Sequence, residues 1–194
     1  MTLHHPPMSR SGRLWRHVII NTRGTWLHGD PRGFRNRKHR IHSSGDYRNP
    51  PPRGEHAALH EYHKHRSADE IHIGRDERAI IGREIVRHLQ TEGYRTLTIA
   101  VTKVHAHLLV QLPGALDDVK AIIGDAKRLS SRAVKKSMPG SVWAAGGTYK
   151  RIVEPSHRQS AFDYILYGQG DGAWTWSFRD GSLEGQFARR RGGG

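Results

Sequence analysis

Apolar residues recur along the chain with two different periods, and each period predicts one kind of element. A spacing of three to four residues places apolar side chains on one side of a helix, whereas strict alternation places them on one face of a strand. Helical spacing covers residues 76–92 and 116–137, and a third helix is expected at 157–168 with Ser156 as its N-cap. Strand-like stretches lie at residues 15–27, 94–103, 104–112 and 147–153, with one more expected in the tail around residues 174–178.

The order of these elements predicts the fold class. Along the chain they follow as β-α-β-β-α-β-α, and the first six match the split βαβ, ferredoxin-like arrangement, an α+β fold with a central antiparallel sheet. We expect one domain over residues 15–179, interrupted at about 28–74 by a basic insertion that shows almost no apolar periodicity. The ends, 1–14 and 180–194, are expected to be a disordered N-terminus and a flexible basic tail.

Charge and composition narrow the classes of partner. The net charge is +14, from 32 Lys and Arg against 18 Asp and Glu, which favours binding to polyanions such as nucleic acid. No apolar run reaches the roughly 18–20 residues that a membrane span needs, and a signal peptide is not recognisable, so a cytoplasmic, nucleoid-associated protein of bacterial type is expected. The absence of cysteine excludes disulfides, thiolate nucleophiles and cysteine-type zinc sites.

The strand at 104–112 carries the clearest candidate for chemistry. In VHAHLLVQL one face is wholly apolar, while the other bears His105 and His107, two residues apart. Because alternate residues of a strand point to the same side, both imidazoles can face one divalent cation. An apolar strand seldom carries two ionisable side chains, which favours a metal site over a pair of ordinary surface histidines.

VHAHLLV resembles the His-hydrophobic-His motif of the HUH single-strand endonuclease superfamily. Further features make the chain similar to the single-tyrosine transposases, including the REP-associated tyrosine transposases. They are the element order, a tyrosine on the last helix, and the segments GTWLHGDPRG and YILYGQG. The resemblance covers roughly residues 15–170. It implies Tyr164 as the nucleophile, with Tyr167 as the rival. The family often has a third ligand four residues after the tyrosine, but here that residue is Gly168, and Gln169 follows five after.

The resemblance also implies the reaction. Such enzymes use Mg²⁺ or Mn²⁺, here expected on His105, His107 and Gln169, to cleave single-stranded DNA and form a 5′-phosphotyrosine during DNA transposition. The expected partners are hairpin-forming single strands and a second copy of the chain in a homodimer. Neutral imidazoles are required for ligation, so activity is expected to fall below a pH of about 6.

Basic residues outside this site are candidates for DNA contacts. They belong to the second long helix and to the insertion: Lys120, Lys127, Arg128, Arg132, Lys135, Arg32, Arg35 and Lys38. A solvated helix face or simple disorder would explain the same charges. Two other functions stay open, namely a non-catalytic, domesticated transposase that binds nucleic acid and a metal-binding or structural basic protein. Covalent linkage of DNA to the protein would separate the enzyme from both.

Overall fold

The computed structural model describes most of the chain as two compact units. The described residues are 12–25, 27, 29–30, 35–36, 41–42, 52, 54–66, 70–170 and 172–181. Residues up to 21 and from 72 onward form the first unit, and residues 22–71 form the second. The expected disordered ends lie largely outside the described residues. No helix among the described residues combines the length and apolar character that a membrane span requires.

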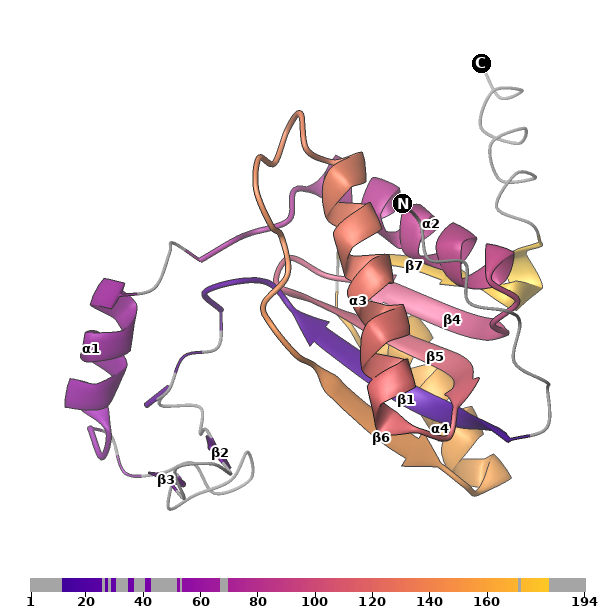
Figure 1. Cartoon of the computed structure of the whole chain (residues 1–194), viewed down its shortest axis with the longest axis horizontal. Helices are drawn as coiled ribbons and strands as arrows, with labels where there is room; N and C mark the ends of the chain where they lie inside the picture. Colours follow the sequence, from indigo (N-terminus) through magenta and orange to yellow (C-terminus); the bar gives the residue numbers. More distant parts are fainter. Residues whose placement is uncertain are drawn as a thin grey trace. The chain divides into compact units, whose positions relative to one another are not determined.

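A five-stranded antiparallel sheet forms the centre of the first unit (Figure 1). Its strands are β1 (Arg13–Asn21), β4 (Thr96–Val101), β5 (His105–Pro113), β6 (Thr148–Ile152) and β7 (Trp174–Ser177). The spatial order is β6-β1-β5-β4-β7, and every neighbouring pair is antiparallel. The first four strands of that order follow the split βαβ arrangement, which confirms the predicted α+β fold class.

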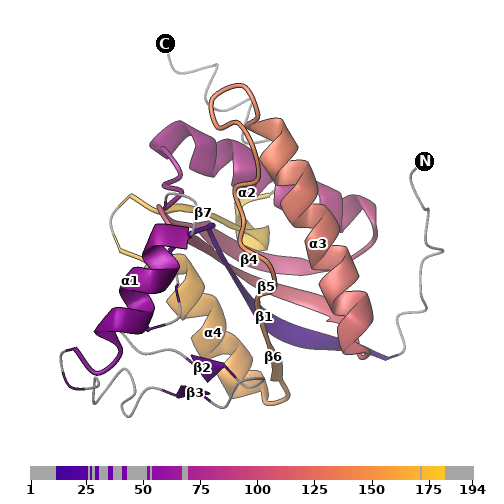
Figure 2. The ribbon, with the colours of Figure 1, turned by 60° about the vertical axis from the view of Figure 1, so that its left-hand side comes forward.

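Three helices cover the two faces of this sheet. They are α2 (Arg75–Thr91), α3 (Leu116–Ala133) and α4 (Pro155–Tyr167). Helices α2 and α3 pack against each other on one face, and α4 lies on the opposite face (Figures 1 and 2). Helices therefore cover both faces of the sheet, and α4 brings the C-terminal part of the chain over the strand that carries the histidine pair.

Alternation along the strands produces a separate apolar cluster on each side. The α2 and α3 side is filled by fully buried aliphatic residues, Val18, Ile20, Ile81, Ile85, Leu89, Leu108, Val110, Val119 and Ile123. The α4 side has a smaller cluster, made of Leu97, Ala100, Leu109, Ile152, Ala161, Phe162 and Ile165. Burial of a large aliphatic or aromatic side chain contributes roughly 1.5–3 kcal/mol. The smaller cluster therefore fixes α4 on the sheet.

Several predicted boundaries are corrected by the structure. Strand β1 ends at Asn21 and does not continue to residue 27, because the chain turns at Thr22–Thr25, where the Thr25 hydroxyl donates to the Thr22 carbonyl over 2.8 Å. The prediction of Ser156 as N-cap is wrong. Helix α4 begins two residues earlier than predicted, at Pro155, whose fixed φ suits the first helical position, and Glu154 is the cap residue.

The second unit contains more regular structure than its sequence predicts. It includes α1 (Ala57–Arg66) and a short antiparallel pair, β2 (Arg35–Asn36) and β3 (Ile41–His42), within a stretch expected to be a loop. The sequence of α1, AALHEYHKHR, has no apolar stripe at helical spacing, which is why its periodicity did not predict a helix. The unit spans 22–71, whereas the insertion was expected at about 28–74.

Gly82 in α2 is required by close packing against β7. A Cβ added there would overlap the ring of Trp174. We predict that Gly82→Ala lowers the free energy of unfolding by ~1–3 kcal/mol, because overpacking outweighs the gain in helix propensity of up to about 1 kcal/mol. Gly124→Ala in α3 is the matched control, since a Cβ there meets open space and should leave stability unchanged or raise it. Urea denaturation of both variants tests this, and equal midpoints would contradict it.

Candidate active site

Two histidines of β5 lie on the sheet face that α4 covers. His107 is 5% exposed, and His105 at the start of the strand is half-buried. The preceding tight turn fixes this start, because the main-chain N–H of His105 donates to the Thr102 hydroxyl over 3.1 Å and the same hydroxyl donates to the His105 carbonyl. The two imidazole centroids are 4.7 Å apart, with ring planes at 82°. The strand therefore places both rings side by side, as the alternation predicted.

A third histidine, which sequence reasoning missed, joins this pair from β1. In the register of β1 and β5, Ile19 lies opposite His107 and His17 lies opposite Leu109, so His17 and His107 are diagonal neighbours on one face. Nε2 of His17 and Nδ1 of His107 are 2.9 Å apart, within hydrogen-bond distance. The alternation of β1 indicates which side His17 occupies, but only the register between the two strands shows that it meets His107.

Burial keeps all three imidazoles neutral. Desolvation lowers the pKa of His107 to about 3, with further lowering by the neighbouring His105 and His17. Desolvation also lowers the pKa of His17 to about 4, assisted by the positive charge of Lys150 and by His157. The pKa of His105 is lowered for the same main reason, although its hydrogen bond with Gln169 partly opposes the shift. A neutral imidazole keeps one nitrogen lone pair, and this is the protonation state that can ligate a metal ion.

Helix α4 places Tyr164 directly beside these rings. Its ring stands edge-on to His107, with centroids 5.6 Å apart, and to His17, with centroids 6.2 Å apart. The residue is 51% exposed, so one side of the phenol is open to a substrate. Tyr167, the rival candidate, is 74% exposed at the last position of the helix, and no ring contact joins it to a histidine among the described residues. Of the two tyrosines, Tyr164 is therefore the one at the histidine cluster.

Gln169 reaches the cluster despite its unusual spacing. Its Oε1 lies 3.3 Å from Nε2 of His105, and its side-chain amide donates to the Tyr164 carbonyl over 3.1 Å. The helix ends at Tyr167, and Gly168 makes the turn that brings the next side chain back toward β5. A Cβ at Gly168 would lie 2.7 Å from the Tyr164 carbonyl oxygen and 2.9 Å from Cδ2 of its ring. Glycine at this position therefore makes room for the tyrosine that precedes it.

Two further polar residues surround the cluster without having been predicted. Lys150 of β6 lies opposite His17 in the strand register and is exposed. His157 is close enough to His17 to affect its pKa, and it precedes Tyr164 by two helical turns on α4. The position of Lys150 follows from the pairing of β1 with β6, and that of His157 from the packing of α4 on the sheet. Lys150 gives this face a positive charge beside His17.

Of the DNA-contacting residues predicted on the second long helix, all but Lys135 lie on α3, on the other side of the sheet; Lys135 follows the helix, which ends at Ala133 and not at residue 137. Lys120 and Arg128 are each paired with an aspartate one turn earlier on the same helix. Lys127 donates to two main-chain carbonyls of a following loop, and burial lowers its pKa. Arg132 and Lys135 are exposed. DNA contacts by these residues remain a prediction, and they would be made away from the histidine face.

The remaining predicted contacts belong to the insertion. Arg32 and Lys38 lie outside the described residues, and the side chain of Arg35 in β2 is also outside them.

The side chains in this cluster that could bind a metal ion are of two kinds, imidazoles and an amide. Among the residues that the structure describes, no three His, Asp or Glu side chains are arranged to hold a metal ion. An ion in this cluster would thus be held by the two β5 imidazoles and the amide oxygen of Gln169.

Comparison with known proteins gives little beyond this geometry. Neither a family model nor a curated protein matches the chain. Its structure is similar to a solved structure described as the REP-associated tyrosine transposase bound to a REP hairpin. The sequence identity is 14% and the TM-score 0.42, with 85% of this chain and 70% of that chain covered. At this distance the likeness does not bear on the chemistry of the side chains.

The lowered histidine pKa values predict how stability depends on pH. Below a pH of about 6.5, His17 and His107 become protonated in the unfolded chain. In the folded protein they stay neutral until the pH approaches their lowered pKa values, about 4 for His17 and about 3 for His107. The unfolded state then binds more protons, so the free energy of unfolding of the metal-free protein should fall between about pH 6.5 and about pH 5. Urea denaturation across this range measures the slope. The double variant His17→Gln/His107→Gln should show a shallower slope, and an unchanged slope would contradict the assignment.

Proposed function

We propose that this protein is a metal-dependent single-stranded DNA endonuclease and strand transferase of the tyrosine transposase type. One observation carries the proposal. The half-exposed phenol of Tyr164 stands edge-on to His107, which with His105 and Gln169 offers two neutral imidazoles and an amide oxygen on one face of the sheet. A nucleophile beside a cluster of uncharged metal donors suits attack on a phosphodiester. The resemblance of VHAHLLV to the HUH motif supports the same reaction.

The chemistry of the donors supports a divalent cation. Two neighbouring ligands of an octahedral ion, each at about 2.1 Å, are separated by about 3 Å. Nε2 of His105 and Oε1 of Gln169 are 3.3 Å apart, which fits that separation. Imidazole nitrogen favours Mn²⁺ over Mg²⁺, since Mg²⁺ prefers oxygen ligands. A bound cation would neutralise charge on the scissile phosphate and stabilise the negative charge that develops during attack.

In this proposal Tyr164 and Lys150 have separate roles in cleavage. The oxygen of Tyr164 attacks phosphorus, a Tyr–O–P bond forms, and the P–O3′ bond breaks. The phenolic proton passes to solvent, and the departing oxygen takes up a proton to become a free 3′-OH. This produces the 5′-phosphotyrosine that the resemblance implies. Lys150, exposed beside His17, would bind a neighbouring phosphate and hold the strand in place.

Reversal of the same step would join strands without external energy. A 3′-OH from another strand attacks the phosphotyrosine, the Tyr–O–P bond breaks, and the phenol is regenerated. Hairpin-forming substrates and a homodimer are implied by the resemblance and remain part of the proposal.

Replacement of Tyr164 tests the nucleophile. We predict that Tyr164→Phe abolishes the covalent protein–DNA adduct, because phenylalanine keeps the ring packing but has no oxygen to attack phosphorus. Tyr167→Phe is the matched control and should retain adduct formation, since Tyr167 lies away from the histidines. The measurement is a denaturing gel after incubation with labelled single-stranded DNA and Mn²⁺. An adduct in the Tyr164→Phe protein that is lost in Tyr167→Phe would reverse the assignment.

Metal binding gives a test that is independent of DNA. Isothermal titration calorimetry should show tighter binding of Mn²⁺ than of Mg²⁺ to the DNA-free protein. His105→Ala should weaken Mn²⁺ binding by at least about tenfold, the size of a lost metal-site partner. His65→Ala is the control, because His65 in α1 is a solvent-exposed histidine of the other unit. Equal Mn²⁺ affinity in the wild-type and His105→Ala proteins would exclude this site.

A further inference from the structure

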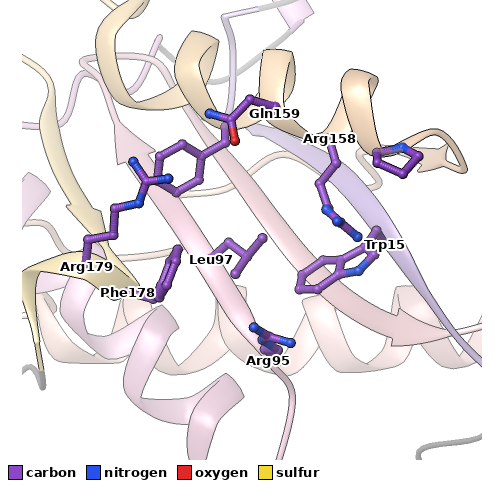
Figure 3. Close-up of a pocket in the computed structure, with 9 residues that line it drawn as sticks. Trp15, Arg95, Leu97, Arg158, Gln159, Phe178 and Arg179 are labelled. Carbon is purple, nitrogen blue, oxygen red and sulfur yellow. The ribbon is translucent and has the colours of Figure 1, made fainter.

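A second site lies at the N-terminal part of α4, on the same face of the sheet as the histidine cluster. It is a cavity of about 260 Å³, lined by Trp15, Arg95, Leu97, Pro155, Arg158, Gln159, Phe162, Phe178 and Arg179. In Figure 3, Leu97 lies between Trp15 and Phe178, with Arg158 and Arg95 on either side of the Trp15 ring. The lining comes from β1, from β4 and the residue before it, from α4, and from the short 3-10 helix η1 (Phe178–Asp180) after β7, so four separate parts of the chain converge here.

Cations and aromatic rings alternate around this cavity. The guanidinium carbons of Arg95 and Arg158 lie 5.7 and 5.5 Å from the ring centre of Trp15. That of Arg179 lies 4.8 Å from the ring of Phe162 and 5.8 Å from that of Phe178. Arginine held against a ring keeps its N–H donors free for an anion.

Three arginine side chains give this cavity a positive charge. None of the three arginines has a carboxylate within salt-bridge distance in the part of the chain that the structure describes, whereas Lys120 and Arg128 on α3 are both paired. Phe178 is 47% exposed, so part of its ring surface is open to a ligand at the edge of the pocket. Three unpaired guanidinium groups and exposed aromatic surface together favour a ligand that is both anionic and aromatic.

We propose that this cavity binds one nucleotide of single-stranded DNA, with the base stacked on the exposed ring of Phe178 and the adjoining phosphates held by Arg95 and Arg158. The proposal rests on the proposed function, because it makes the cavity a subsite for the strand that Tyr164 cleaves. Aromatic and arginine surfaces are the usual platforms for unpaired bases. A duplex could not place a base here without unstacking it.

The position along α4 fits a flanking nucleotide. Arg158 and Tyr164 are six residues apart on the same helix, which corresponds to about 9 Å at a rise of 1.5 Å per residue. Stacked B-form phosphates are spaced by about 3.4 Å of axis per strand, and an unstacked strand spans more. The bound nucleotide would therefore lie within about three positions of the scissile phosphate, and the cavity would select the sequence or structure next to the cut.

DNA binding without cleavage tests the site. The probe is a fluorescein-labelled single-stranded oligonucleotide, and the protein carries Tyr164→Phe, with no added metal. Fluorescence anisotropy should show that Phe178→Ala weakens binding by roughly 5- to 150-fold, the range for loss of one stacked base. Arg95→Gln and Arg158→Gln should each reduce the slope of log affinity against log salt by about 1. Arg151→Gln, which removes an exposed arginine of β6 on the other side of the sheet, should leave the slope unchanged.

Abasic substitutions identify the base that is bound. Replacing one nucleotide at a time by an abasic residue should weaken binding at one position, and Phe178→Ala should remove that effect. The proposal is overturned if abasic residues have the same effect in the Tyr164→Phe protein with and without Phe178→Ala. It is also overturned if RNA of the same sequence binds as tightly as the DNA and this binding depends on Phe178. If binding depends on the cavity but no adduct forms with Tyr164 intact, the proposed cleavage is wrong while the subsite stands. If adducts form but Phe178→Ala leaves binding unchanged, the subsite is wrong.

Discussion

The pairing of β1 with β5 is the constraint on which the rest of the molecule depends. All nine residues of β1 are matched to β5, from Arg13 opposite Pro113 to Asn21 opposite His105. Because side chains alternate across a sheet, a shift of one residue would move His17 and Trp15 to the face covered by α2 and α3. The histidine cluster would then lose one member and the cavity one wall. The buried aliphatic residues at alternate positions make such a shift costly.

Helix α4 combines three environments along its length. Its first turns border the cationic and aromatic cavity, its middle is held by Phe162 and Ile165 in an apolar cluster, and its last turn carries Tyr164. The apolar middle keeps the two polar ends at a constant separation. Rigid support of this kind lets a site hold a nucleophile and a neighbouring base in a fixed geometry.

Periodicity predicted the elements of the first unit because their apolar stripes are the cause of their packing. It also placed His105 and His107 on one face, since alternation is a local property of a strand. His17, Lys150 and the cavity depend on register and on contacts between distant segments, which a single sequence does not encode locally. Helix α1 was missed for the opposite reason, because it has the helical conformation without an apolar stripe.

Gln169 uses both ends of its amide, with the oxygen toward His105 and the nitrogen on the carbonyl of Tyr164. This single side chain is thus a mechanical link between the histidine strand and the backbone that bears the phenol. A substitution at this position therefore removes two contacts at once, the one with the His105 ring and the one with the end of the helix. The residue one place earlier, Gly168, has no side chain, so the five-residue spacing gives both contacts to the amide of Gln169.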